Sequence, residues 1–234
     1  MKPKILVTGG DGRFAKTLKR KNKKLNLIFK SKNELNILKI KSLEKSIKTL
    51  KPKIVLHTAG LSRPMNLHDK NISKSIDLNI MGTCNIVKVC EKYNIKLVYF
   101  STGYVYEGKK GNYKEQDPVK PFNNYGLSKL AGECAVQMYK NSLILRITMT
   151  EKPFAYKKAF TNLKTNFMYH EDLADYLPKL INKKGIINVG GKPQSVFNFA
   201  KKDNPKIKGI KASKSMKLPL NQTMNLNLLK KVIE

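Results

Sequence analysis

The feature that most constrains this chain is a glycine-rich turn between an apolar strand and a helix. Lys4–Thr8 is a short apolar run, and Gly9–Gly12 (GGDG) follows it directly, ahead of a helical pattern near residues 12–20. Glycines at this place let the backbone turn sharply and approach a pyrophosphate, which then rests on the helix N-terminus. An ordinary turn is the alternative, because glycines punctuate many loops. The position after a first strand favours a dinucleotide-binding turn.

The rest of the chain alternates short apolar strands with helical patterns. Strands are expected at residues 25–29, 54–57, 97–100 and 143–147, and helices near 42–50, 71–93 and 125–140. This alternation is typical of βαβ units. The sequence therefore predicts an α/β fold with a Rossmann-type, doubly wound parallel sheet.

The pattern loosens after about residue 150. A helix is expected near 171–182, a strand at 185–189 and a final short helix near 225–232. We therefore predict a dinucleotide-binding Rossmann domain over residues 1–150 and a small C-terminal annex over residues 151–234.

The chain is strongly basic, with 47 Lys+Arg against 16 Asp+Glu and a formal net charge of +31. Such a charge ordinarily suggests a nucleic-acid partner. The basic residues are spread along the chain, however, and only Arg13, Arg20, Arg63 and Arg146 are arginine. Arginine is the favoured reader of phosphates and guanine edges, and lysine is a weaker substitute. We therefore expect no specific nucleic-acid partner, while an anionic small substrate is compatible with the charge.

Other patterns that would direct the chain elsewhere are missing from its sequence. No apolar run reaches the roughly 18 residues that a membrane span requires, and the first residues lack a signal-peptide pattern. Three cysteines are too few and too oddly numbered for a disulfide framework, and the three histidines form no metal-ligand cluster. We expect a cytoplasmic protein with no membrane partner and no bound metal.

The end of the second predicted strand bears on cofactor choice. An acidic residue there would accept the ribose hydroxyl of NADH, but this strand runs into Lys30, Ser31 and Lys32. Arg13, in the first helical turn, is expected to project toward the same side. The sequence therefore predicts a preference for NADPH.

Tyr125 and Lys129 stand four residues apart at the start of a predicted helix, which places both on one face. Free tyrosine titrates near pH 10, so an efficient acid at neutral pH needs a shift of roughly three units, or about 4 kcal/mol. A neighbouring Lys⁺ favours the phenolate and supplies part of that shift. Thr102 ends a buried strand, where ligands of open parallel sheets collect. These three residues are candidate catalytic groups; the alternative is an ordinary surface pair of Tyr and Lys.

Several motifs together resemble the extended short-chain dehydrogenases/reductases. They are the Thr-Gly-x-x-Gly turn, the loop His57–Gly60, the helical segment Asn79–Asn85, the strand end at Thr102 and the segment Tyr125–Lys129 (YGLSK). The stretch from Phe100 to Glu133 most resembles the dTDP-4-dehydrorhamnose reductases and related nucleotide-sugar reductases. Residues 185–191 (GIINVGG) with Ser195 resemble the family's later segment. Gly103 departs from the Asp common in these reductases, and the interval between Arg146 and His170 looks shorter than in full-length relatives.

The resemblance implies transfer of a hydride from NADPH to a keto carbon, C4 of a 6-deoxy-4-keto nucleotide sugar. Tyr125 would protonate the oxyanion, and Thr102 would orient the carbonyl. Lys129 would tune the pKa of Tyr125 and hold the ribose. The cofactor would be lined by Gly9, Asp11, Gly12, Arg13, Phe14, Ala59, Gly60 and Leu61, together with Lys30, Ser31, Tyr125 and Lys129. Basic groups of the annex would bind the diphosphate of the nucleotide-sugar substrate, and a homodimer is expected by analogy.

Two alternatives stay open. One is a nucleotide-sugar 4-epimerase, which would hold its nicotinamide tightly and return the hydride. The other is a non-catalytic NADP-binding regulatory subunit.

Two further features also have alternative interpretations. Ser62–Pro64 is either a contact for a substrate phosphate or a simple loop. Asn79 is a candidate for ordering the site through backbone contacts or water.

Overall fold

The computed structural model describes residues 2–216 and 218–234 and is built around a parallel sheet of six strands. The strands are β1 (Lys4–Thr8), β2 (Asn26–Lys30), β3 (Ile54–His57), β4 (Lys96–Thr102), β5 (Ser142–Ile147) and β10 (Gly185–Val189), in the spatial order β10-β5-β4-β3-β1-β2. Every pairing in this sheet is parallel. The predicted α/β fold with a Rossmann-type sheet is confirmed.

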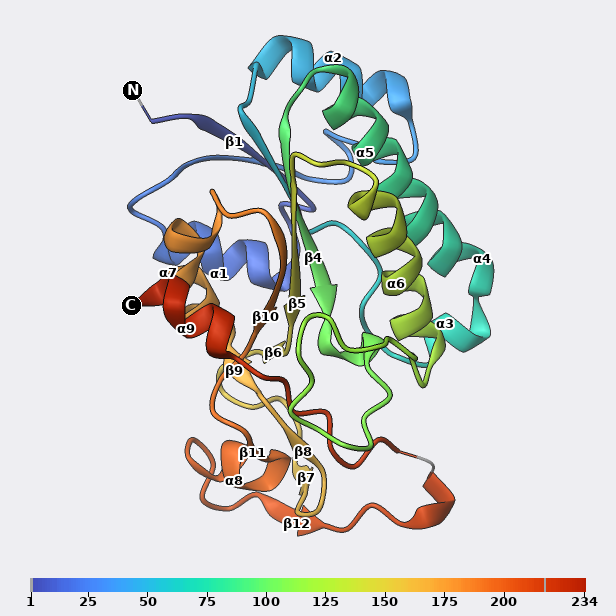
Figure 1. The fold of residues 1–234 in the computed structure, drawn as a ribbon, viewed down its shortest axis with the longest axis vertical. Coiled ribbons are helices and arrows are strands. Elements are labelled where there is room, and N and C mark those ends of the chain that lie inside the picture. The colour runs from blue at the N-terminus through green and yellow to red at the C-terminus, as the bar shows by residue number, and fades with distance from the viewer. Residues whose placement is uncertain (1, 217) are drawn as a thin grey trace.

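Helices cover both faces of the sheet (Figure 1). One face carries α2 (Ile40–Leu50), α5 (Gly82–Lys92) and α6 (Asn124–Gln137), and the other carries α1 (Arg13–Lys21), α7 (His170–Leu180) and α9 (Asn227–Ile233). Alternate residues of a strand point to opposite faces. Val7 accordingly packs with Phe14 and Leu173, whereas Leu6 packs into the separate core of the α2–α5 face.

The helix expected near residues 71–93 is confirmed over residues 72–92, but its middle is not α-helical. The structure has α3 (Leu67–Lys70) and α4 (Ile72–Ser75), then a π-helical stretch, η1 (Ile76–Met81), which leads directly into α5. A π-helix has a wider turn than an α-helix and often occurs at functional sites. Here the stretch contains the buried Asn79.

A small annex lies beyond the carboxyl ends of the strands (Figure 1). Its core holds Phe154, Phe199 and Ile207. It is made of short elements: β6 (Met149–Thr150), β7 (Lys158–Phe160), β8 (Lys164–Thr165), β9 (Met168–Tyr169), β11 (Gln194–Ser195), α8 (Val196–Lys201), β12 (Lys208–Ile210) and η3 (Lys214–Met216). The main sheet takes β10 from beyond residue 150, and the division of the chain at that residue stays a prediction.

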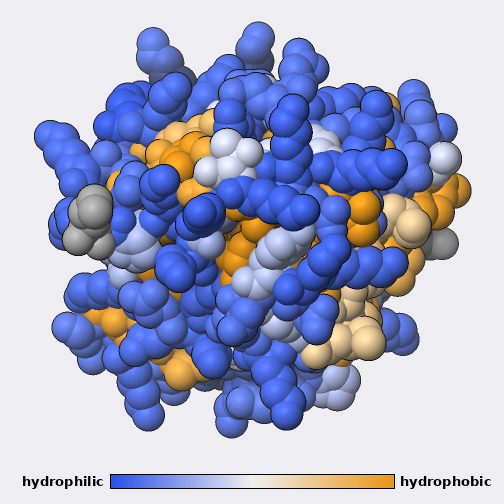
Figure 2. Space-filling view, turned by 90° about the horizontal axis from the view of Figure 1, so that it is seen from above, coloured by the Kyte–Doolittle hydropathy of each residue, from blue (hydrophilic) through white to orange (hydrophobic). Residues whose placement is uncertain are grey.

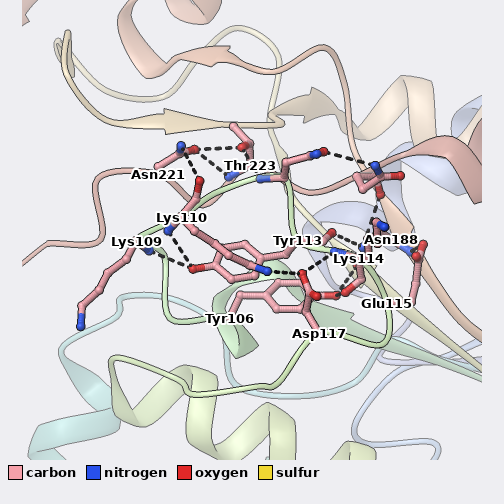
Figure 3. Close-up of polar contacts among 12 residues, drawn as sticks. Tyr106, Lys109, Lys110, Tyr113, Lys114, Glu115, Asp117, Asn188, Asn221 and Thr223 are labelled. Carbon is pink, nitrogen blue, oxygen red and sulfur yellow. Dashed lines mark hydrogen bonds and ion pairs between the residues drawn. The ribbon is translucent and has the colours of Figure 1, made fainter.

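The loop between β4 and α6 begins with a short 3₁₀ helix, η2 (Gly103–Val105), and is held against the C-terminal segment (Figure 3). The rings of Tyr106 and Tyr113 stack with centroids 4.7 Å apart. The Tyr113 hydroxyl accepts the backbone N–H of Lys109 at 2.9 Å. The Asn188 side chain, at the end of β10, donates to the Tyr113 carbonyl at 2.9 Å. This loop connects Thr102 to Tyr125, so its anchoring limits the movement of both.

A buried ion pair joins α6 to β5. Arg146 Nη2 lies 2.8 Å from Glu133 Oε2, and both side chains are almost completely buried. The Ser101 hydroxyl donates to the same carboxylate, and Arg146 Nη1 donates to the Tyr106 hydroxyl at 2.9 Å. Breaking such a pair from one side leaves an uncompensated buried charge.

The surface is dominated by hydrophilic side chains, as Figure 2 shows for one face of the molecule. Interspersed apolar patches interrupt this coverage without forming a continuous face in that view. Within the described ranges 2–216 and 218–234, the helices are all too short or too polar to cross a membrane.

We expect Glu133→Ala to destabilise the protein by roughly 3–5 kcal/mol, because Arg146 would stay buried without its partner. Urea unfolding followed by circular dichroism measures this. Glu44→Ala is the matched control, since Glu44 pairs with Lys92 at the surface, and it should cost far less. Equal losses in the two variants would contradict a structural role for the buried pair.

Candidate active site

A cleft of about 640 Å³ opens at the carboxyl ends of the central strands. Its walls come from the loops after β1, β3, β4 and β5 and from the annex. In doubly wound sheets, ligands bind outside the carboxyl ends of the strands, where the strand order reverses. That reversal lies between β1 and β3 here.

The cleft brings together ten of the thirteen predicted site residues. They are Asp11, Gly12, Arg13, Phe14, Ala59, Gly60, Leu61, Thr102, Tyr125 and Lys129. Gly9, in the turn after β1, and Lys30 and Ser31, at the end of β2, lie outside the cleft lining.

The glycine turn after β1 packs closely against the backbone of the loop after β3. Gly9 has φ of +69°, and a Cβ there would lie 2.8 Å from the Cα of Ala59. Gly12 precedes α1 and gives no side-chain cap, so the first N–H groups of that helix have no side-chain acceptor at the N-cap. The first turn of α1 also has no acidic residue. An anion such as a pyrophosphate fits this end of the helix.

Asn79 connects the loop after β3 to the helix of Tyr125. Its Oδ1 accepts the N–H of Leu61 at 2.7 Å, and its Nδ2 donates to the Leu61 carbonyl and to the Ser128 hydroxyl, both at 2.9 Å. Ser128 in turn donates to the Tyr125 carbonyl at 2.8 Å. Asn79 therefore orders the site through direct contacts, including backbone contacts at Leu61.

His57 is a structural residue. Its ring nitrogens contact the Thr8 hydroxyl at 2.8 Å and the Thr83 hydroxyl at 3.2 Å. Burial, reinforced by the charge of Lys129, lowers the pKa of His57 to about 3. The ring is therefore neutral and ties β1 to β3 and α5.

Tyr125 faces the cleft from the first turn of α6, whose N-cap Asn123 accepts the N–H of Gly126 at 2.8 Å. Burial raises the pKa of Tyr125 to about 12, and the neighbouring Thr102 hydroxyl and the charges of Arg63 and Arg13 oppose that rise. The phenol is therefore protonated at neutral pH, the form that a proton donor requires.

Lys129 lies one turn further along α6. Its Nζ is 4.1 Å from the centroid of the Tyr99 ring, a cation–π contact. Burial lowers the pKa of Lys129 to about 7, against the opposing charge of Glu133. Lys129 is therefore only partly charged at neutral pH, and its effect on Tyr125 stays a prediction.

Arg13 does not project toward the end of β2, which corrects the expectation from sequence. Its guanidinium reaches across the cleft, donating to the Ser62 hydroxyl at 3.1 Å and lying 3.1 Å from Glu151. Arg63 also reaches Glu151, at 2.7 Å. The start of α1 and the loop after β3 are thereby joined to the start of the annex. Ser62–Pro64 is thus more than a simple loop, since Arg63 lines the cleft.

Crowding by a neighbouring side chain explains why a glycine stands at position 103. A Cβ at this position would lie 2.7 Å from the Thr148 hydroxyl oxygen. The Asp that related reductases commonly carry after the threonine therefore cannot fit without displacing Thr148.

The sequence missed the annex side of the cleft. Met149, Glu151, Tyr156, Phe167 and His170 line it. The segment is irregular between β6 and α7, so strand or helix periodicity gave no signal there. Across the ranges 2–216 and 218–234, no group of three or more His, Cys, Asp or Glu residues is placed to hold a metal ion.

Residues 2–166 match the family described as RmlD substrate binding domain. The chain belongs to this family. It is 26% identical over 152 residues to a dTDP-4-dehydrorhamnose reductase from Aggregatibacter actinomycetemcomitans, covering 63% of this chain and 51% of that protein. It is also 32% identical over 114 residues to methionine adenosyltransferase 2 subunit beta from Xenopus laevis, covering 48% of this chain and 34% of that protein.

Solved structures agree with the RmlD-type fold. A hypothetical dTDP-4-dehydrorhamnose reductase from Sulfolobus tokodaii matches with a TM-score of 0.86 at 25% identity, covering 100% of this chain and 95% of that one. A dTDP-4-dehydrorhamnose reductase from Bacillus anthracis, solved with NADP, matches with a TM-score of 0.87 at 23% identity, covering 99% and 92%. By sequence, the matches span about half of the first of the curated relatives and about a third of the second.

The depressed pKa of Lys129 predicts how stability depends on pH. The unfolded lysine keeps its ordinary value of 10.5 and the folded one titrates near 7, so between these values the unfolded chain binds more protons. Stability should therefore rise with pH in this window, by up to about 1.4 kcal/mol per unit. Urea unfolding at pH 7, 8 and 9 measures the slope. Lys129→Met should flatten it relative to the unsubstituted chain, and identical slopes would contradict the depressed pKa.

Proposed function

We propose that this protein is an NADPH-dependent reductase of a 4-keto-6-deoxy nucleotide sugar, similar to the dTDP-4-dehydrorhamnose reductases. The observation that carries this proposal is the placing of Thr102, Tyr125 and Lys129 in one cleft with the glycine turn of β1. The match to the RmlD substrate binding domain and the relatives named as reductases support the same chemistry.

The residues present fit a nicotinamide dinucleotide. The uncapped start of α1, the close approach of Gly9 to Ala59 and the absence of acidic residues in that first turn suit a pyrophosphate. Asp11, Gly12, Arg13 and Phe14 would hold one side of the cofactor, and Ala59, Gly60 and Leu61 the other. A neighbour of the same fold is solved with NADP. When bound, NADPH supplies the hydride.

The protein's own groups would handle the proton and the position of the substrate. The Tyr125 hydroxyl, protonated at neutral pH, donates its proton to the oxygen of the reduced carbonyl. Thr102 is a buried residue at the end of β4, and its hydroxyl orients that carbonyl. Lys129 holds the ribose of the cofactor and, in its charged form, stabilises the developing phenolate.

A positively charged group in the cleft supports this substrate class. Arg63 lines it beside Tyr156, whose ring lies 5.8 Å from the guanidinium carbon. An Arg fork suits the phosphates of a nucleotide sugar. A related structure of the same fold, from Bordetella bronchiseptica, holds NAD and UDP, at 18% identity and a TM-score of 0.76.

Tyr125→Phe should reduce the turnover of NADPH with 4-keto-6-deoxy nucleotide sugars by roughly 10²–10⁴-fold, because the proton donor is lost while the ring is kept. The measurement is the loss of NADPH absorbance with a panel of such sugars, with NADPH binding followed by calorimetry. Tyr139→Phe is the matched control, since its hydroxyl bonds the backbone at Cys90 and Ile95 and does not line the cleft. Full turnover in Tyr125→Phe would contradict the assigned role.

A regulatory subunit is the second candidate, favoured by the relatives named methionine adenosyltransferase 2 subunit beta. Binding of NADPH with no turnover of any sugar in the panel, combined with capture of a methionine adenosyltransferase catalytic chain, would favour it. An epimerase would instead retain its dinucleotide through purification and oxidise no added NADPH.

A homodimer belongs to the same proposal. Ile72, Ile76 and Met81 are exposed on α4 and η1, and Leu127 and Met138 are exposed along and just beyond α6. Burying this apolar surface against a second copy would remove it from water. Light scattering of the purified chain distinguishes the dimer from a monomer.

A further inference from the structure

At the end of β2, basic and polar groups bind a carboxylate of the protein itself, that of Glu34. The Glu34 carboxylate accepts the backbone N–H of Ser31 at 2.9 Å, the Ser31 hydroxyl at 2.8 Å and the Lys30 ammonium at 3.1 Å. A backbone amide, a hydroxyl and a cation thus converge on one negative group. The same three donors are the kind that bind a phosphate.

This cluster lies beside the glycine turn. Lys30 is the last residue of β2, and its carbonyl accepts the N–H of Gly10 at 2.8 Å. In dinucleotide-binding folds, the residues at this strand end meet the adenosine ribose, where NADPH carries a phosphate and NADH a hydroxyl. Arg13, the other cation expected here, is instead directed to Ser62 and Glu151.

We infer that Glu34 sets the choice between NADPH and NADH by occupying the place of the 2′-phosphate. This inference rests on the proposed function, since it concerns the cofactor of that site. A 2′-phosphate must displace the carboxylate or bind beside it against like-charge repulsion, and a ribose hydroxyl meets neither cost. Glu34 therefore weakens a preference for NADPH that Lys30 and Ser31 would otherwise make strong.

Glu34 also has a structural role, which the test must separate from its charge. Ser31 and Glu34 form a reciprocal capping arrangement, in which the N–H of Glu34 lies 3.4 Å from the Ser31 hydroxyl and the N–H of Leu35 donates to the Ser31 carbonyl at 2.9 Å. Backbone and side-chain hydrogen bonds from Ser31 lower the pKa of Glu34 to about 2, so the carboxylate is charged at neutral pH. Glutamine keeps an acceptor for the Ser31 N–H but removes the charge and releases Lys30.

The test measures calorimetric binding of NADP⁺ and NAD⁺, which differ only by the 2′-phosphate, to the full chain and to Glu34→Gln. Glu44→Gln is the matched control, because Glu44 is another carboxylate paired with a surface lysine, Lys92, and it lies on α2. Thermal unfolding of each variant reports on the capping contacts. We expect Glu34→Gln to lower the dissociation constant of NADP⁺ by about fivefold or more, and to leave that of NAD⁺ unchanged within about twofold. Glu44→Gln should change neither.

Three outcomes would overturn the inference. An unchanged ratio of the two dissociation constants in Glu34→Gln would show that Glu34 only caps the turn. Weaker binding of NAD⁺ would show that the carboxylate accepts the ribose hydroxyl. Binding of neither dinucleotide to the unsubstituted chain would overturn the proposed function itself, and with it the inference.

Discussion

The buried pair of Glu133 and Arg146 is the contact on which the geometry of the site depends. Glu133 lies on α6, one turn after Lys129, and Arg146 lies on β5. Ser101, which precedes Thr102 on β4, donates to the same carboxylate. The pair therefore fixes the helix of Tyr125 and Lys129 against the strand of Thr102. Removing either partner would loosen this register and leave a charge without water or counterion.

Burial also explains the electrostatics of the cleft. It raises the pKa of Tyr125 to about 12 and lowers those of Lys129 and His57 to about 7 and 3. In each case the neutral form is favoured, as expected where water is excluded. The Tyr125 phenol is therefore protonated at neutral pH, and the charge on Lys129 changes with pH near neutrality. A counter-charge on Glu133 keeps that lysine from losing its proton more completely.

The annex completes the cleft with few residues. Glu151 bridges Arg13, the first residue of α1, and Arg63, in the loop after β3. A single carboxylate thus joins α1 and the loop after β3 to the short segment that follows β5. At the end of β2, the Glu34 carboxylate accepts hydrogen bonds from Lys30 and Ser31. In a chain with a net charge of +31, two acidic residues thus pair with Arg13, Arg63 and Lys30 around the proposed cofactor site.

The sequence by itself determined the alternation of strands and helices and the glycine turn, and it indicated Thr102, Tyr125 and Lys129 as candidate residues. Those features are local, since strand and helix periodicity and short motif spacing are set by near neighbours along the chain. Only the tertiary structure decided where long side chains point and how buried each group is. Arg13 meets Glu151, which lies far along the chain, and Lys129 titrates near 7 because surrounding elements exclude water from it. Such contacts depend on how distant segments pack, and no pattern within one segment records them.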